Sequence, residues 1–265
     1  MDIKQKQMAN EEQKQVIKLL AESAAKPGCM FLEVGSWMGE STLLLANTAK
    51  QHGGHVVCVD WWKGNRGTDL TNIASKIDVQ SIFWAKICKE KLEHVVIPIK
   101  SESLLASKFI KDDTFDIVFL DADHRYNGIL NDIKNYSSKV KKKNGILCGH
   151  DCEGYINDYE LSFLEKGKNI DYFETVHCGV VLAVARSFEE YSINHSIWSV
   201  KHICINNKWE PVNIDLRGLE NRKQTPAPAL GITQNHSLVR YGMTVYAVPF
   251  SIDPASVKKE EELIK

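Results

Sequence analysis

Phe31 to Ala46 reads FLEVGSWMGESTLLLA, and this stretch says most about the architecture of the chain. A short apolar run ends in a turn that carries Gly35 and Gly39, and a leucine-rich helical pattern follows. Glycines allow a positive φ and a close approach of the backbone to a ligand. The free N–H groups at the start of the next helix favour a carboxylate or a phosphate. The stretch therefore predicts a strand, a tight turn and a helix N-terminus that hold an anionic group.

A second β-branched run, His55 to Val59, ends on Asp60. An acid about 20 residues past a glycine turn, at the end of the second strand, can accept hydrogen bonds from ribose hydroxyls. A solvated acid at a strand end is the plainer alternative. A dinucleotide fits less well, because G-x-G-x-x-G requires a glycine where Glu33 stands. A turn that binds no ligand also stays open.

The segment from Phe115 to Tyr126, FDIVFLDADHRY, contains an apolar run that suits a parallel strand buried on both faces. It breaks into Asp121, Asp123 and His124, at the end of the sheet where open α/β folds bind ligands. A carboxylate such as Asp121 is costly there without a cation or hydrogen-bond donors. Asp123 has an alternative role as a helix N-cap.

Gly145 to Asp151, GILCGHD, predicts a turn and a short strand that ends at His150 and Asp151. Strands alternate with helical patterns along the chain, which predicts an α/β fold with a doubly wound, mostly parallel sheet. The expected strands are Met30–Val34, Val56–Val59, Val95–Ile99, Ile117–Leu120 and Ile146–Cys148.

These motifs resemble those of class I S-adenosylmethionine-dependent methyltransferases, within the subfamily of catechol O-methyltransferase-like, natural-product and sugar O-methyltransferases. The order acid, x, Gly, three residues, Gly from Glu33 to Gly39 is similar to their first motif. Asp60-Trp61-Trp62-Lys63-Gly64 is similar to D-x-W-x-G, and the end of FDIVFLDADHRY to F-I-D-G-D-H-x-Y, with Ala122 in place of glycine. The resemblance covers about residues 28–203 and implies a Rossmann-like sheet with an antiparallel closing strand near Ser196 to Ile203.

The resemblance also implies a cofactor site for S-adenosyl-L-methionine. Its residues would hold the methionine moiety at the glycine turn and the ribose at Asp60. Trp61 would wall a pocket or belong to the core, and Ser101 would contact the adenine or cap a helix. The full expected set is Glu33, Gly35, Ser36, Gly39, Ser41, Asp60, Trp61, Ser101 and Asp121.

Carried over by position, Asp121, His150 and Asp151 would bind a divalent metal. Two carboxylates suit Mg²⁺, whereas a nitrogen ligand shifts the preference toward Mn²⁺, Fe²⁺ or Zn²⁺. His150 could instead serve only as an acid or base. His124, three residues beyond Asp121, is implied as the catalytic base, with Asp121 beside it; helix capping or packing is its alternative role.

The expected function is O-methylation of a small-molecule or sugar hydroxyl, assisted by a metal. Methyl transfer is an in-line displacement, so the protein mainly aligns the reactants and removes the acceptor proton. One alternative is a metal-independent methyltransferase with His124 or His150 as base. Another is a non-catalytic binding or scaffold protein on the same fold.

Composition limits the other possibilities. The 265 residues are 43% hydrophobic and 25% charged, which suits a globular chain with a large core. A net charge of −1 and the lack of a basic face argue against a nucleic-acid partner. Seven scattered cysteines without a C-x-x-C pair indicate reduced thiols and a cytoplasmic location. Neither a signal peptide nor a spanning segment is evident, which argues against a membrane partner.

The expected domains are residues 1–27, with a helix near 8–25 that packs on the core; the methyltransferase domain, 28–203; and a C-terminal β-rich extension, 204–265. The extension, with an expected strand or hairpin at Ser237 to Phe250 and a polar helix at the end, could cover the sheet edge, form a homodimer contact or shape the acceptor pocket. One helix from Ile73 to Leu92 is expected beside the acceptor, and another from Gly179 to Phe188.

Overall fold

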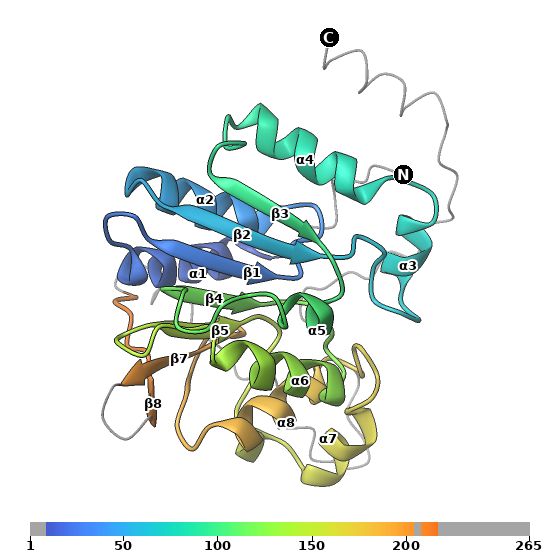
Figure 1. Cartoon of the computed structure of the whole chain (residues 1–265). Helices are drawn as coiled ribbons and strands as arrows, with labels where there is room; N and C mark the ends of the chain where they lie inside the picture. The colour runs from blue at the N-terminus through green and yellow to red at the C-terminus, as the bar shows by residue number, and fades with distance from the viewer. Residues whose placement is uncertain (1–8, 204–207, 217–265) are drawn as a thin grey trace. The chain divides into compact units, whose positions relative to one another are not determined.

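The computed structural model describes residues 9–203 and 208–216. The strands in this part are β1 Met30–Val34, β2 His55–Asp60, β3 Val96–Lys100, β4 Ile117–Leu120, β5 Ile146–Gly149, β6 Ser192–Asn194, β7 Ile197–Ile203 and β8 Lys208–Pro211. The helices are α1 Glu11–Ala24, α2 Glu40–Gln51, α3 Asp69–Ala74, α4 Val79–Lys89, α5 Ser103–Ala106, α6 Tyr126–Ser137, α7 Leu161–Gly167, α8 Cys178–Ser187 and the 3-10 helix η2 Ile156–Asp158. Figure 1 shows how the helices flank one sheet.

The sheet has the order β3-β2-β1-β4-β5-β7-β6, and β8 also pairs with β7. Strands β1 to β5 pair in parallel, whereas β7 is antiparallel to β5, β6 and β8. The order reverses between β1 and β4. The carboxyl ends of these two strands therefore meet at the switch point where α/β sheets bind ligands.

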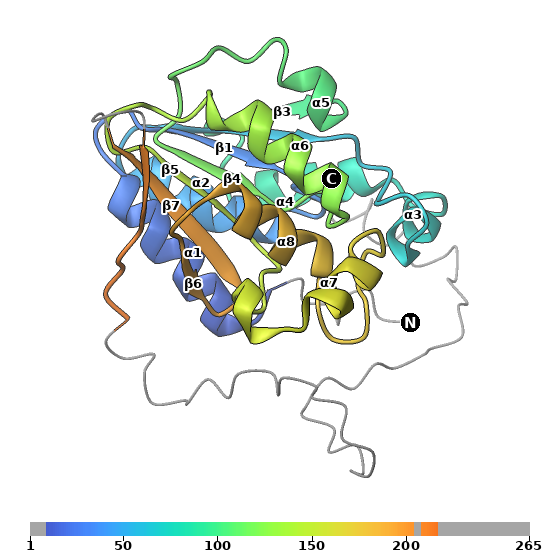
Figure 2. The ribbon, with the colours of Figure 1, turned by 90° about the horizontal axis from the view of Figure 1, so that it is seen from below.

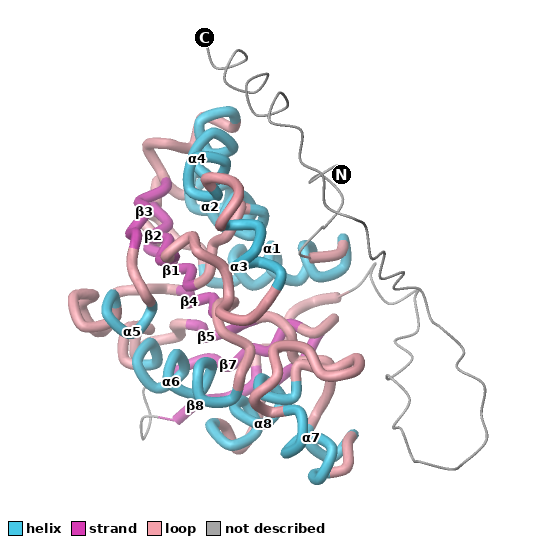
Figure 3. The backbone as a smooth tube through the Cα atoms, turned by 90° about the vertical axis from the view of Figure 1, so that its right-hand side faces the viewer, coloured by secondary structure: helices cyan, strands magenta, loops and turns pink. Residues whose placement is uncertain are grey.

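Alternate residues of the central strands enter two cores on opposite faces of the sheet, as the period of a strand requires. Phe31 and Ile117 pack in the core that contains residues of α1, α2 and α4. Leu32 and Val118 pack in the core that contains residues of α6 and α8. Figures 2 and 3 show the two helical layers on either side of the sheet.

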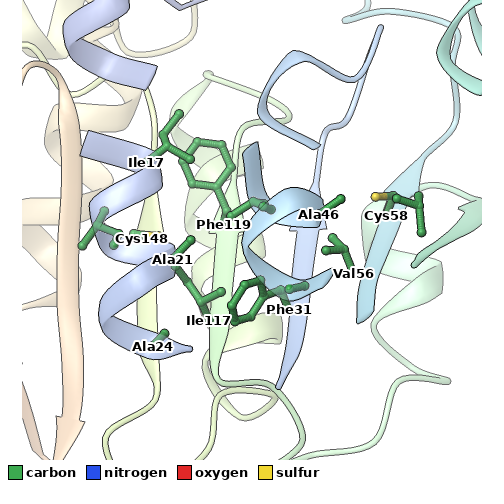
Figure 4. Packing of buried hydrophobic residues seen from close by; sticks show 14 of the residues in the cluster. Ile17, Ala21, Ala24, Phe31, Ala46, Val56, Cys58, Ile117, Phe119 and Cys148 are labelled. Carbon is green, nitrogen blue, oxygen red and sulfur yellow. The ribbon is translucent and has the colours of Figure 1, made fainter. Parts of the chain in front are cut away.

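Helix α1 presents one apolar face to the first of these cores. Its side chains Val16, Ile17, Leu20 and Ala21 are buried, and they repeat at the three-to-four-residue spacing of a helix. Figure 4 shows Ile17 and Ala21 close to Phe119 and Ile117 of β4. The helix begins at an Asn10 N-cap that completes a capping box with Gln13.

The predicted α/β class with a mostly parallel sheet and an antiparallel closing strand is confirmed. The expected strands Met30–Val34 and Ile117–Leu120 have the predicted bounds, and the other strands differ by one or two residues. The sheet continues past residue 203, because β8 pairs with β7. The strand expected at Ser237 to Phe250 and the final helix lie outside the described residues.

One local prediction was wrong, and one of the alternatives left open for Asp123 is excluded. The single helix expected from Ile73 to Leu92 is two helices, α3 and α4, because the Asp78 side chain accepts from the Ser81 amide and starts a new helix. The N-cap of α6 is Arg125 rather than Asp123, which instead accepts hydrogen bonds from the backbone and guanidinium of Arg125. None of the described helices is both long and apolar enough to cross a membrane.

Candidate active site

The turn after β1 depends on its glycines. Gly35 has φ +94° and Gly39 has φ +83°, both in the left-handed region that glycine favours. A Cβ atom on Gly35 would lie 2.1 Å from the carbonyl oxygen of Asp121. The space beside Gly35 is therefore filled by the end of β4, so the turn and this strand end are in direct contact.

Glu33 is a fully buried carboxyl group beneath this turn. Its Oε2 accepts a hydrogen bond from Thr42, but Oε1 has no partner within the described structure. Burial raises the pKa of Glu33, although the hydrogen bond from Thr42 opposes the shift. The buried Ser36 hydroxyl also lacks a partner there. Buried polar atoms are normally satisfied, so these two fit contact with a polar ligand.

Asp60 ties the turn to the end of β2. Its Oδ2 accepts from the Trp37 amide at 2.7 Å, and its Oδ1 accepts from the Trp62 amide at 2.6 Å. Burial raises its pKa, against these backbone hydrogen bonds. Each oxygen keeps a further lone pair, so ribose binding stays a prediction. Trp37 and Trp62 themselves have φ +43° and +53°, strained values that cluster at functional sites.

The aromatic and serine candidates surround Asp60. Trp61 is half-buried with the Arg66 guanidinium 5.2 Å from its ring centroid, whereas Trp62 is buried against Phe83. Trp61 therefore remains available to a ligand, and Trp62 belongs to the core. The Ser101 amide donates to the Asp60 carbonyl at 2.9 Å, which places Ser101 next to the end of β2.

Asp121, His150 and Asp151 converge at the ends of the adjacent strands β4 and β5, as the sequence predicts. Each offers one ligand atom, and these atoms lie within 4.8 Å of one another. His150 Nδ1 is 3.6 Å from Asp121 Oδ1 and 3.3 Å from Asp151 Oδ1. Asp151 has φ +61°, an uncommon conformation that turns the chain at this point.

His124 lies beside the same carboxylates. Its Nε2 is 3.2 Å from Asp151 Oδ2 and 3.6 Å from Asp121 Oδ1. Burial alone would lower the pKa of His124, but Asp151, Asp121 and Asp171 raise it well above its ordinary value. The pKa of His150 is likewise raised by Asp151 and Asp121 against its burial. Burial would raise the pKa of Asp151, yet His150 and His124 hold it well below its usual range.

Four polar residues of this cluster were missed by the sequence analysis. His177, at the start of α8, has Nδ1 2.5 Å from Glu153 Oε1 and 3.6 Å from Asp151 Oδ1. Asp171 Oδ1 lies 3.2 Å from His124 Nδ1, and Asn65 lies 3.4 Å from the same oxygen. Glu153, two residues after Asp151 in D-C-E, was the most accessible of these to sequence reasoning.

The chemistry of this donor set fits a divalent cation. Carboxylate oxygens suit Mg²⁺ or Mn²⁺, and imidazole nitrogens suit transition metals. Both ring nitrogens of His124 and Nε2 of His150 are buried without a hydrogen-bond partner in the described structure. Two carboxylates this close repel each other unless protons or a cation intervene. His124, Asp151 and His177 form a second group with ligand atoms within the same 4.8 Å limit.

Known proteins share the fold. Residues 32–152 match a family described as a methyltransferase domain. A comparison with curated proteins gave no match. Among solved structures, a candidate caffeoyl-CoA O-methyltransferase from Staphylococcus aureus is 14% identical, with TM-score 0.50 over 73% of this chain and 84% of that chain. A protein from Corynebacterium glutamicum is 15% identical, with TM-score 0.50 over 73% of this chain and 82% of its own.

At these sequence identities, the likeness to the two solved structures shows the fold alone. Residues 32–152 contain the glycine turn, Asp60 and the acids that follow β4 and β5. This part of the chain therefore resembles a methyltransferase domain.

Proposed function

We propose that this protein transfers the methyl group of S-adenosylmethionine to a hydroxyl of a small molecule or sugar, with the help of a divalent cation. The observation that carries the proposal is the contact between the glycine turn and the end of β4. Gly35 packs on the Asp121 backbone, so the glycine turn lies next to the group formed by Asp121, His150 and Asp151. The description of the Staphylococcus aureus neighbour as an O-methyltransferase agrees with a hydroxyl acceptor.

The cofactor contacts follow from the unpartnered atoms. Glu33 Oε1 and the Ser36 hydroxyl, both buried beneath the turn, suit the ammonium group of the methionine moiety. The N-terminus of α2, where Ser41 lies, suits its carboxylate. Asp60 would accept from the ribose hydroxyls through its remaining lone pairs, with Trp61 and Ser101 on the adenine side.

Asp121, His150 and Asp151 would hold the cation. A bound divalent ion lowers the pKa of an acceptor hydroxyl and orients its oxygen. His124 Nε2 lies 3.2 Å from Asp151 Oδ2. We propose that His124 receives the acceptor proton at Nε2. A cation held by Asp121 and Asp151 would offset the negative charges that raise the pKa of His124, and the ring would then be neutral.

A metal-independent methyltransferase is the second candidate, because His124 and His150 already place imidazole groups beside Asp121. In that case one of these histidines would act as base without a cation. The cofactor residues would be the same, so chelation separates the two mechanisms. A non-catalytic binding protein would bind neither the methyl donor nor its product.

Calorimetric titration with S-adenosylmethionine and with S-adenosylhomocysteine tests the proposal first. We expect both to bind, and an absence of heat with folded protein would contradict the proposal. A panel of phenols, sugars and other hydroxyl compounds is then screened for release of S-adenosylhomocysteine. The screen is run with Mg²⁺, with Mn²⁺ and with a chelator, and turnover that survives chelation would select the metal-independent mechanism.

A further inference from the structure

The segment around α5 presents large apolar side chains to solvent. Leu104 and Leu105 of α5 are 50% and 51% exposed, and Phe109 just beyond it is 82% exposed. Single exposed apolar residues are ordinary, but an exposed group of them marks a binding surface. None of the three belongs to the cofactor or cation residues described above, so the proposed reaction leaves them unexplained.

The three side chains share one side of a helical path. The amides of Phe109 and Ile110 both donate to the Ala106 carbonyl, at 3.0 and 3.2 Å, so helical geometry continues past the end of α5. Residues three or four apart lie on the same side of such a path. Ala106 and Ile110 form the inner side, which packs on the core that contains residues of α6 and α8. The opposite side, here called the outer face of α5, consists of Leu104, Leu105, Lys108 and Phe109.

The neighbouring edge strand adds to this surface. Ile97 of β3 is 45% exposed and lies on the same face of the sheet as Ile99, which packs in the same core as Ala106 of α5. Figures 2 and 3 show α5 at the outside of the helical layer that contains α6. Pro98, in the middle of β3, has no N–H group, which argues against a partner that adds a strand at this edge.

The charge at the outer face of α5 is positive. Lys108 lies within this face and Lys111 follows it, and both side chains are exposed. Neither forms an ion pair with a residue in the described part of the chain. Each neighbouring acid has a partner of its own: Glu102 pairs with Arg66, Asp112 pairs with Lys139, and Asp113 accepts from the Lys142 amide. An occupant of this face should therefore be apolar with a negatively charged rim.

We propose that the outer face of α5 docks on the anionic surface of a lipid bilayer. Leu104, Leu105 and Phe109 would enter the boundary between headgroups and acyl chains, and Lys108 and Lys111 would lie against the anionic headgroups. Surface docking needs only a few inserted side chains, so it is compatible with a sequence in which no spanning segment is evident. This inference does not depend on the proposed methyl transfer.

A second copy of the chain is a poorer occupant. A stable dimer buries about 800 Å² on each partner, which is more than this small group of side chains supplies. A two-fold contact centred here would also bring Lys108 of both copies together, although the neighbouring acids are already engaged. Lipid headgroups instead provide the missing negative charge.

Co-sedimentation of the full chain with vesicles tests the proposal. One set of vesicles is phosphatidylcholine alone, and the other contains equal parts of phosphatidylcholine and phosphatidylglycerol. Phe109→Ser removes the most exposed apolar side chain, and Lys108→Gln removes one charge. Leu161→Ser, at a 53% exposed leucine of α7, and Lys18→Gln, at an exposed lysine of α1, are the matched controls.

We expect the wild type to bind the anionic vesicles and to leave them at high salt, because salt screens the attraction. Phe109→Ser should lower the partition at least about tenfold, as for the loss of a buried phenylalanine side chain. Lys108→Gln should lower it about fivefold on anionic vesicles only. Both controls should bind as the wild type does. No vesicle binding by the wild type, or equal binding by Phe109→Ser and Leu161→Ser, would overturn the proposal.

Light scattering and ligand binding are measured on the same proteins. A wild-type dimer that Phe109→Ser converts into monomers, without any vesicle binding, would assign the outer face of α5 to a second copy and overturn the lipid proposal. Unchanged unfolding midpoints show that the variants are folded. Failure of the wild type to bind S-adenosylhomocysteine would contradict the proposed function and leave the vesicle result standing.

Discussion

Asp132 is a buried carboxyl group on α6 that takes no part in the proposed chemistry. Burial raises its pKa to about 7. The unfolded chain releases this proton near pH 4, so between about pH 4 and pH 7 the folded state holds more protons and loses stability as the pH rises. Asp132→Asn keeps the shape without the charge. It should stabilise the fold by about 2–4 kcal/mol at pH 8 and by much less at pH 4.5.

Urea unfolding at the two pH values measures this difference. Asp69→Asn, at an exposed position, should change the stability little at either pH. An equal effect of Asp132→Asn at pH 4.5 and pH 8 would show that its carboxyl group is not protonated in the folded state.

Asp121 is the residue on which the metal proposal depends most. Asp121→Asn keeps the side-chain size but removes a charged ligand, so Mg²⁺ or Mn²⁺ affinity should fall by about 1.5–3 kcal/mol. Affinity for S-adenosylhomocysteine should stay within a few-fold of wild type, because the turn itself is intact. Calorimetry with each ligand measures both effects, with Asp69→Asn as control. Metal affinity that is unaffected by the substitution would favour the metal-independent candidate.

At the scale of elements, α8 approaches the His124 loop through Gly179. A Cβ atom at this position would lie 2.3 Å from the His124 carbonyl oxygen and 2.5 Å from the Tyr126 amide nitrogen. Backbone atoms cannot move aside cheaply, so Gly179→Ala should destabilise the fold by about 2–3 kcal/mol. Gly67→Ala is the control, because a Cβ atom added at Gly67 would meet no atom within 4 Å. Only its φ of +81° opposes alanine there, which should cost about 1 kcal/mol of stability. The urea midpoints compare them, and equal losses would contradict the close-approach argument.

The central strands could be predicted because a parallel strand buried on both faces is an uninterrupted apolar run. Met30–Val34 and Ile117–Leu120 are such runs, and polar residues mark where they end. The break between α3 and α4 was missed because Ile73 and Ile77 keep the four-residue spacing of a helix across it, although Asp78 is a residue type that often starts a helix. Helical periodicity alone does not distinguish one helix from two short ones.

The candidate site was predictable where it follows the strands. Asp121, His150 and Asp151 lie at strand ends, so sheet topology brings them together. His177 and Asp171 come from the segment around α7 and α8, whose path over the sheet is set by tertiary contacts such as Tyr126 N to Lys168 O. No local pattern encodes that path.

At the scale of the whole described domain, the cofactor should act as a stabiliser, because its expected contacts come from several elements of one sheet. S-adenosylhomocysteine at about 100 times its Kd adds about 2.7 kcal/mol to the free energy of unfolding. For a protein of this size that corresponds to a rise in Tm of about 5–10 °C. Differential scanning fluorimetry measures the shift. Adenosine lacks the carboxylate that the turn would bind, so at the same concentration it should raise the Tm less. An equal rise in Tm would contradict the turn as the carboxylate site.

The contact between Gly35 and the carbonyl of Asp121 has a thermodynamic consequence. The Asp121 amide also donates to the Val34 carbonyl, so the residue after β4 contacts both the last residue of β1 and the glycine that follows it. A molecule that fixes the turn must then restrict the carboxylate that follows β4, and a cation on that carboxylate must restrict the turn. Once one ligand is bound, less conformational entropy is lost when the other binds. By linkage, each ligand raises the affinity of the other by the same factor. Bound demethylated cofactor would therefore raise the affinity for the ion, and a bound ion would slow the dissociation of the demethylated cofactor.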